Sequence, residues 1–268
     1  MKHFLGALKS KADVRDYKVA AAGSEFPESY TCANIPPVKN QKSVSSCVAH
    51  ATAAILETLN TNETNEYTPL STNFIYGMQG VALGRLQGGM YLRDACKIVK
   101  EYGDPTKETI NGNTEQPKCT EELKAQLNDE VYKEANVFKV ASYARCSNDK
   151  AVKHALMHYG PVLGSVNWYD KYTIKDDVIY FDKNSEHGRH AIMVYGWNEK
   201  GWLCQNSWGK KWNGNGRFIF PHDDKFNELW SFVDANNNDV VTPKNNRWLN
   251  YIYKFINLIV NFFSRFQK

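Results

Sequence analysis

Cys47 is the residue of this sequence whose position best suits covalent chemistry. It opens the run CVAHATAAILETLN, where apolar residues recur at helical spacing, so we expect a helix from about 47 to 59 with Ser45 or Ser46 as its N-cap. A thiol in the first turn of a helix lies beside unpaired backbone N–H groups and the positive end of the helix dipole, which favours the thiolate. With a histidine partner, a thiol pKa of about 8.5 falls to roughly 3.5 to 7.5, which gives a nucleophile at neutral pH. The alternative is a cysteine that only packs inward.

A histidine and an asparagine far along the chain could complete such a site. His190 opens an apolar run typical of a strand, residues 198–201 are typical of a turn, and a second strand ends at Asn206. Folding this hairpin brings His190 and Asn206 together, within a slip of a few residues. The amide can then fix the orientation and tautomer of the imidazole without adding a negative charge. The alternative for His190 is a purely structural histidine.

The elements that must position these residues change in type at Gly160-Pro161. Before that point helical spacing dominates, and we expect further helices near 70–80, 90–102, 119–129 and 149–159. After it come short β-rich runs separated by turn residues, namely PVLGSVNWY, DVIYF, HAIMVYGW, GWLCQN and GRFIFP. Helices followed by strands predict an α+β protein of two lobes, the second a twisted antiparallel sheet or small barrel. A site between the lobes would draw residues from both.

Composition and charge exclude several classes of protein. A chain of 268 residues with 23% charged and 13% aromatic residues is globular rather than disordered. Residues 247–268 hold four basic and no acidic residues and so account for the whole formal charge of +4. The rest of the chain has no basic footprint, and we expect no nucleic-acid partner. The first residues do not form the apolar run of a secretory signal.

The cysteines indicate free thiols rather than a disulfide scaffold or a zinc site. They are sparse and none form a CxxC pair: Cys32, Cys47, Cys96, Cys119, Cys146 and Cys204. His154 and His158 lie four residues apart, but without the glutamate of a metallopeptidase helix. We therefore expect no metal and no other cofactor.

Two segments and their order resemble the papain-like cysteine peptidases of the C1 family. The stretch Gln41–Cys47 is similar to the oxyanion and nucleophile segment of that family. Asn206-Ser207-Trp208-Gly209, downstream of His190, is similar to its asparagine motif. The resemblance covers roughly residues 13–220. It implies a two-lobed α+β fold with a helical left lobe and an antiparallel, β-barrel-like right lobe.

The resemblance also implies a thiol endopeptidase that hydrolyses peptide bonds in a peptide or protein substrate. Cys47 would attack the carbonyl carbon, and His190 would carry the proton to the leaving amine and later activate water. Asn206 would orient His190, and Gln41 would donate a hydrogen bond to the oxyanion. Trp208 would cover the hydrogen bond between His190 and Asn206.

Substrate-binding residues are implied in the same way. Gly88 and Gly89 resemble a glycine pair whose bare backbone hydrogen-bonds an extended substrate. Leu163, Ser165 and Ala191 would line the pocket for the second residue upstream of the cleaved bond, with Trp208 near the substrate.

The domain boundaries follow from these segments. Only 46 residues precede Cys47, too few for the long inhibitory propeptide of lysosomal-type members, so the chain looks more like the compact bacterial and viral forms. In that setting we expect a cytoplasmic or membrane-associated protein. We expect an N-terminal lead-in (1–40), a catalytic domain (41–235, with a helical lobe at about 41–148 and a sheet lobe at about 149–235), a linker (236–246) and an amphipathic basic helix (247–268).

The expected C-terminal helix has a narrow polar stripe and a wide apolar face. Three asparagines and a lysine inside it argue against a membrane span. Its basic and aromatic residues suit either contact with a membrane surface or docking on the body or on an oligomer partner.

Two other functions are compatible with the same residues. One is a catalytically silent protein that binds peptides in the same cleft. The other is an acyl-transferring, transglutaminase-like enzyme that uses the same thiol.

Overall fold

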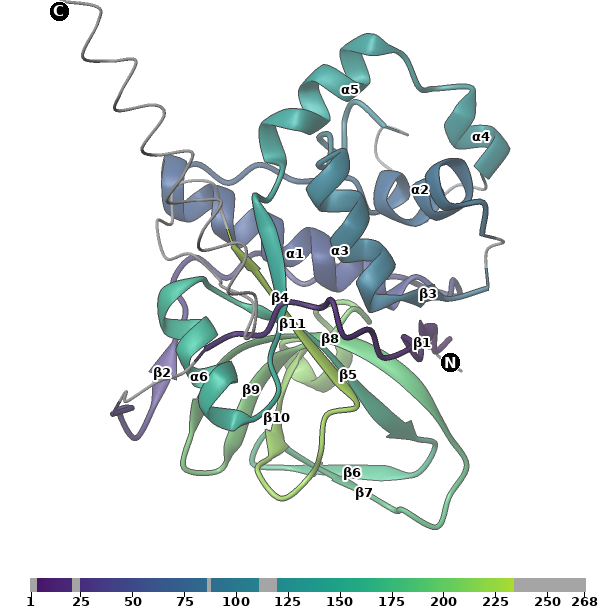
Figure 1. Ribbon diagram of the computed structural model, residues 1–268. Helices are drawn as coiled ribbons and strands as arrows, with labels where there is room; N and C mark the ends of the chain where they lie inside the picture. Colours follow the sequence, from purple (N-terminus) through teal and green to yellow (C-terminus); the bar gives the residue numbers. More distant parts are fainter. Residues whose placement is uncertain (1–3, 21–24, 86–87, 111–119, 234–268) are drawn as a thin grey trace, which may run out of the picture.

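The computed structural model describes residues 4–20, 25–85, 88–110 and 120–233. The helices before residue 136 gather in one lobe, and most strands lie in the other together with the helix at Asp149–His158; the N-terminal segment runs along the boundary between the two (Figure 1). The α+β class and the two-lobed arrangement predicted from the sequence are confirmed.

The helices agree with the predicted ones in type, with shifted ends. The expected helix at 90–102 starts only at Leu92, because the two residues before it form a strand. The region 119–129 holds one short helix and the start of another, because the Asn128 side chain accepts from the N–H groups of Glu130 and Val131 and caps a new helix. The described helices are α1 (Cys47–Thr64), α2 (Thr72–Leu83), α3 (Leu92–Glu101), α4 (Thr120–Lys124), α5 (Asp129–Ala135) and α6 (Asp149–His158), with 3-10 turns η1 (Asn136–Phe138) and η2 (Trp212–Gly214).

The sheet lobe is mostly antiparallel and open. Its strands lie in the order β4-β11-β5-β8-β9-β10-β7-β6, with β2 paired to β8. Among the strands described for this sheet, only β10 and β7 pair in parallel. The expected antiparallel lobe is an open sheet and not a closed barrel: among the described strands, β4 and β6 lie at opposite edges and do not pair, and β4 and β11 contact α3. The strands are β2 (Tyr30–Thr31), β4 (Ser142–Arg145), β5 (Val162–Tyr169), β6 (Tyr172–Lys175), β7 (Val178–Phe181), β8 (His187–Asn198), β9 (Gly201–Gln205), β10 (Arg217–Pro221) and β11 (Glu228–Val233).

Each lobe has its own hydrophobic core, and α1 is the central helix of the helical one. Every residue from 47 to 59 is buried, so α1 is surrounded on all sides and its start is held firmly. Leu163, Ala191 and Met193 of the sheet lobe belong to the same cluster as α1. The core of the helical lobe therefore fixes strands β5 and β8 against the beginning of α1.

The hairpin predicted around residues 198–201 is formed by β8 and β9. Asn198 pairs with Gly201, and the register shifts between Val194 and Gly196 at a β-bulge. A bulge moves the pairing by one residue and increases the local twist. The hairpin still brings the end of β9 alongside the first half of β8.

The N-terminal segment, residues 4–20, is part of the folded body. Within it β1 (Ala7–Leu8) pairs in parallel with β3 (Met90–Tyr91) of the helical lobe. Further along, Asp16 forms an ion pair with the mostly buried Arg93 of α3. Both contacts tie the segment to the boundary between the lobes.

The expected linker at 236–246 and the expected helix at 247–268 lie outside the described residues, and their roles stay predictions. No helix in the described ranges is long and apolar enough to cross a membrane.

Gly103, in the turn after α3, gives a test of this packing. Its φ is 78°, and a Cβ there would lie 1.8 Å from the carbonyl oxygen of Ala135. We expect Gly103→Ala to lower the free energy of unfolding by about 3 kcal/mol, since backbone must move as well as adopt a left-handed conformation. Gly84 has a φ of 63° but nothing within 4 Å of its Cβ position, so Gly84→Ala should cost only about 1 kcal/mol. If urea denaturation showed the same loss of unfolding free energy in Gly103→Ala and Gly84→Ala, this account would be contradicted.

Candidate active site

Cys47 is the first residue of α1, as the sequence predicts, and its sulfur faces strand β8. The backbone N–H of Ala191 donates to Cys47 Sγ at 3.4 Å, and Cys47 is fully buried. Ser46 is the N-cap residue, but its side chain makes no capping hydrogen bond; its hydroxyl lies 3.2 Å from Nδ1 of His50. The thiol thus lies where the central helix of one lobe meets a central strand of the other.

The thiolate expected from the helix N-terminus is not favoured in this conformation. Burial raises the pKa of the Cys47 thiol to about 11, although backbone N–H groups of Ala191, Gly6 and Val48 donate toward the sulfur and oppose that rise. The groups that favour an anion are therefore in place, but desolvation of the enclosed sulfur outweighs them. At neutral pH the residue is a thiol here.

His190 lies on β8 and is held by Asn206, as the hairpin predicts. Its Nε2 atom is 2.7 Å from Asn206 Oδ1. Because an amide oxygen can only accept, Nε2 carries the proton of this hydrogen bond, and Nδ1 is the nitrogen that remains for proton exchange. Asn206 Oδ1 also accepts from the Ser207 N–H at 2.7 Å, which fixes the orientation of the amide.

Trp208 covers this pair. Its ring lies 4.7 Å from the His190 ring at an interplanar angle of 30°, and the edge of Trp168 packs against both rings. His190 and Asn206 are buried under these indoles. A hydrogen bond enclosed in this way is strengthened, because little water can compete for it.

Gln41 is buried between the lobes, and its amide is fully engaged. Nε2 donates to the carbonyl oxygens of Phe4 and Val44, each at 2.8 Å. Oε1 accepts from the hydroxyl of Ser207 at 2.6 Å, which sets the direction in which the NH2 group points. Ser207 was not singled out from the sequence, although it lies inside the motif that starts at Asn206.

The backbone of the N-terminal segment occupies the space beside the thiol. The Phe4 carbonyl oxygen accepts from Gln41 Nε2, and the Gly6 carbonyl oxygen accepts from the Met90 N–H at 2.7 Å. A Cβ on Gly6 would lie 2.1 Å from the carbonyl oxygen of Ser45. This contact was not predicted; its signal in the sequence is a glycine among the bulky residues of HFLGALK.

Gly88 and Gly89 lie against this segment rather than binding it directly. Both backbone N–H groups donate to the Tyr76 hydroxyl, at 3.2 and 3.3 Å. A Cβ on Gly89 would lie 2.8 Å from the Gly6 carbonyl oxygen, so the glycine permits the close approach of the segment. The main-chain hydrogen bond to Gly6 comes from Met90, the next residue. Substrate binding by the glycine pair stays a prediction.

Leu163, Ser165 and Ala191, expected to line a substrate pocket, are all buried side by side on β5 and β8. Glu228 of β11 pairs with Ser165 and is buried with them. Its Oε2 accepts from the backbone N–H of Ser10, in the N-terminal segment, at 3.3 Å. Glu228 was missed from the sequence; an acid at the start of the apolar strand ELWSFV is the signal that could have found it.

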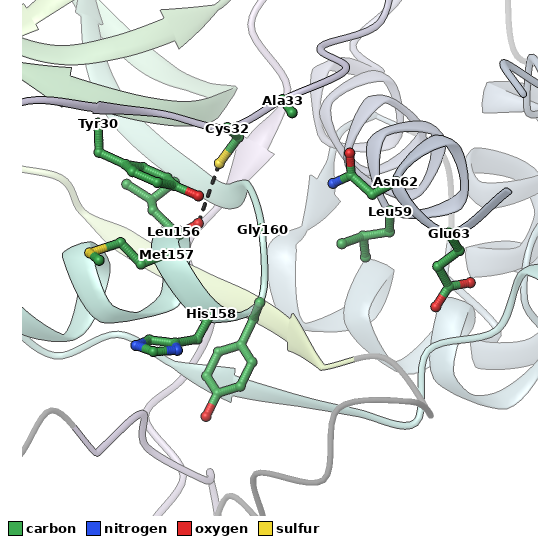
Figure 2. A pocket seen from close by; sticks show the side chains of 11 residues that line it. Tyr30, Cys32, Ala33, Leu59, Asn62, Glu63, Leu156, Met157, His158 and Gly160 are labelled. Atoms are coloured by element: carbon green, nitrogen blue, oxygen red, sulfur yellow. Dashed lines mark hydrogen bonds between the residues drawn. The ribbon is translucent and has the colours of Figure 1, made fainter. Parts of the chain in front are cut away.

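A pocket lies away from these residues, near the ends of two helices. A pocket of about 510 Å³ lies between the end of α1, α6 and the strand β2, and Figure 2 shows the Cys32 thiol bonded there to the Leu156 carbonyl oxygen at 3.4 Å. None of the expected site residues lines it. The pocket is lined by Tyr30, Cys32, Ala33, Leu59, Asn62, Glu63, Leu156, Met157, His158, Tyr159 and Gly160.

Other expected features concern cysteines and metals. The five cysteines in the described ranges are free and buried; Cys119 lies outside those ranges. Among described residues, no group of three or more histidine, cysteine and acidic side chains is arranged to hold a metal ion.

Curated proteins of similar sequence include cathepsins and a viral peptidase-like protein. Among curated proteins, cathepsin K of Mus musculus is 26% identical to this chain. The match covers 68% of this chain and 55% of the length of cathepsin K. A peptidase C1-like protein of Acanthamoeba polyphaga mimivirus is 25% identical over 81% of each chain.

Solved structures support the fold. Xylellain, a cysteine protease from Xylella fastidiosa, superposes with a TM-score of 0.75 at 20% identity, covering 87% of this chain and 96% of that one. The digestive procathepsin L 3 of Tenebrio molitor gives a TM-score of 0.66 at 16% identity, over 84% of this chain and 76% of that one. The family profile described as papain family cysteine protease matches residues 26–229, which is most of the chain. The chain therefore belongs to the papain family of cysteine proteases.

Proposed function

We propose that the protein is a thiol endopeptidase in which Cys47 is the nucleophile and His190 the proton carrier. The single observation that carries the proposal is the meeting of two elements from different lobes. The residue next to His190 donates its N–H to Cys47 Sγ at 3.4 Å, while His190 itself is held by Asn206 at 2.7 Å. A nucleophile, a base and an orienting group in this order form the arrangement that covalent acyl transfer requires.

The reaction follows once the N-terminal segment has left the thiol. The proton of Cys47 Sγ passes to His190 Nδ1, and the sulfur forms a bond to the substrate carbonyl carbon. Gln41 Nε2 and the Cys47 backbone N–H then stabilise the oxyanion. The imidazolium gives its proton to the leaving amine as the C–N bond breaks. Water, deprotonated by His190, attacks the thioester, and the thiol leaves with that proton.

The substrate class follows from the same site: a peptide or protein whose backbone replaces residues 4–8 beside β3. A catalytically silent peptide-binding protein would bind such a chain without releasing an amine. A transglutaminase-like enzyme would pass the acyl group to an added primary amine. Mass spectrometry of a peptide incubated with and without an amine acceptor separates these three functions.

Substitutions at the site test the roles of these residues. We expect Cys47→Ala to abolish peptide hydrolysis, His190→Ala to lower kcat/KM by about 10³-fold, and Gln41→Ala by about 10²-fold, since one oxyanion donor is lost. Asn206→Ala should lower kcat/KM less than His190→Ala does. A thiol-directed epoxide should label Cys47, and His190→Ala should suppress that labelling. Equal labelling of all six thiols would refute the proposal.

The N-terminal segment predicts a second effect on activity, because it fills the space that substrate needs. We expect Gly6→Ala to displace the segment and to raise peptide hydrolysis by at least about tenfold, since its Cβ would meet the backbone of Ser45 at 2.1 Å. The fully exposed Val14 lies in the same segment, so Val14→Ala is the matched control and should change nothing. Unchanged activity in Gly6→Ala, with the fold retained by circular dichroism, would contradict a blocking role.

The raised pKa of Cys47 predicts the pH dependence of its alkylation. The thiolate is the reactive form, so in the wild type the rate of labelling by iodoacetamide should rise with pH up to about 11. In Gly6→Ala the sulfur is no longer fully desolvated, so the profile should move to lower pH. Coincident profiles would show that the segment does not set the pKa of the thiol.

A further inference from the structure

Beneath the segment that carries Gln41 lies a buried cluster of one lysine and two acids. Lys39 precedes Gln41 by two residues, Glu57 lies on α1, and Asp104 follows the turn after α3. Glu57 and Asp104 are fully buried, and the side chain of Lys39 is 13% exposed. Buried charges of this kind are costly unless they are paired or neutralised.

Glu57 is only half satisfied. Its Oε1 accepts from Lys39 Nζ at 2.5 Å and from the Leu70 N–H at 2.8 Å. Its Oε2 is buried and has no hydrogen-bond partner among the described residues. One oxygen therefore carries the ion pair, and the other is free to accept a proton donor.

Asp104 has no cation on its carboxyl group. Both of its oxygens are buried and without a hydrogen-bond partner among the described residues. Burial first, and then repulsion from Glu57, raise the pKa of Asp104 well above its ordinary value, while Lys39 and the backbone N–H of Ser71 oppose this rise. A neutral carboxyl supplies an O–H donor, whereas an ionised one would leave a bare charge in the interior.

The other charged and titratable groups around Glu57 and Asp104 do not remove the need for a proton on one of these two carboxyl groups. Lys107 acts on Glu57 from the loop after Asp104, and Tyr67 is near Glu57 in the loop before α2. Glu134 of α5 adds further repulsion on Asp104 and itself binds Thr106 and Thr109.

Lys39 also connects this cluster to the proposed active site through its backbone. Its carbonyl oxygen accepts from the Gly209 N–H at 2.9 Å, and the next residue, Asn40, forms a β-bridge with Trp208. The Gln41 N–H donates to the Ser207 carbonyl oxygen at 2.8 Å. The side chain of Lys39 therefore ties to α1 the same short segment whose backbone binds the loop after Asn206.

We infer that Glu57 and Asp104 hold one proton between them, so that the pair presents a single negative charge to Lys39 and keeps the segment bearing Gln41 in place. Lys39 and Glu57 are then positioning residues that act through Gln41. This second part rests on the proposed function, whereas the shared proton does not.

The shared proton is tested by stability alone. An acid whose pKa is higher in the folded than in the unfolded state loses stabilising effect as pH rises above the unfolded pKa. Between about pH 5 and pH 9 the folding constant of the wild type should therefore fall, relative to Asp104→Asn, by up to tenfold per pH unit until the folded pKa is passed. Asp104→Asn should be at least as stable as the wild type at neutral pH, and Glu57→Gln should be less stable, since Lys39 loses its partner.

Parallel pH dependence of the wild type and Asp104→Asn in urea denaturation would overturn the shared proton. Should Asp104→Asn fail to fold, infrared spectroscopy of the wild type gives the answer. A protonated-carboxyl band at neutral pH that disappears on unfolding supports the inference, and its absence refutes it.

The positioning role is tested by a double-mutant cycle. Lys39→Met should lower kcat several-fold with little change in KM, and Lys39→Arg should restore most of it. In a Gln41→Ala background, Lys39→Met should cause no further fall in kcat. Equal falls in both backgrounds would overturn the positioning role. Absence of hydrolysis in the wild type and in Gly6→Ala would instead refute the proposed function and leave the stability result standing.

Discussion

The contact between the first residue of α1 and strand β8 is the constraint on which the site depends. The Ala191 N–H donates to Cys47 Sγ, and the side chains of Ala191 and Met193 complete the core of the helical lobe. The strand that presents His190 is thus also a wall of the other lobe's core. Packing at native density allows little freedom at such a junction, so the position of the imidazole follows from the packing of α1.

Desolvation decides the chemical state of the thiol in this conformation. The start of a helix and the backbone N–H groups around the sulfur favour an anion, yet the pKa of Cys47 rises to about 11, because the sulfur is fully enclosed. Gly6 helps to enclose the Cys47 sulfur, and its backbone N–H is also one of the groups that favour the anion. In the proposed mechanism, the segment beside the thiol therefore blocks the site in two ways, since it takes the space of a substrate and keeps Cys47 protonated.

The features that depend on local patterns of residues could be predicted from the sequence. The helical spacing after Cys47 and the hairpin turn near residue 198 were enough to place Cys47, His190 and Asn206 on their elements. The sequence did not predict β1 and β3, since strands of two residues have no periodicity and exist only through tertiary pairing. The burial of Glu228 was not predicted either. Its Oε1 accepts locally from Trp230 Nε1, but the N–H that binds its Oε2, that of Ser10, lies 218 positions away in sequence.

If Gln41 donates to the oxyanion as proposed, covering of the site by the N-terminal segment and catalysis exclude each other. Its NH2 group has two N–H donors. One donates to the Val44 carbonyl oxygen, within the local turn, and the other donates to the Phe4 carbonyl oxygen. Ser207 holds Oε1, so the amide cannot rotate to offer a further N–H without losing a buried hydrogen bond. An oxyanion that forms beside Cys47 must therefore take the donor that Phe4 now occupies. In the proposed mechanism, the N-terminal segment and the transition state therefore compete for this one N–H of Gln41.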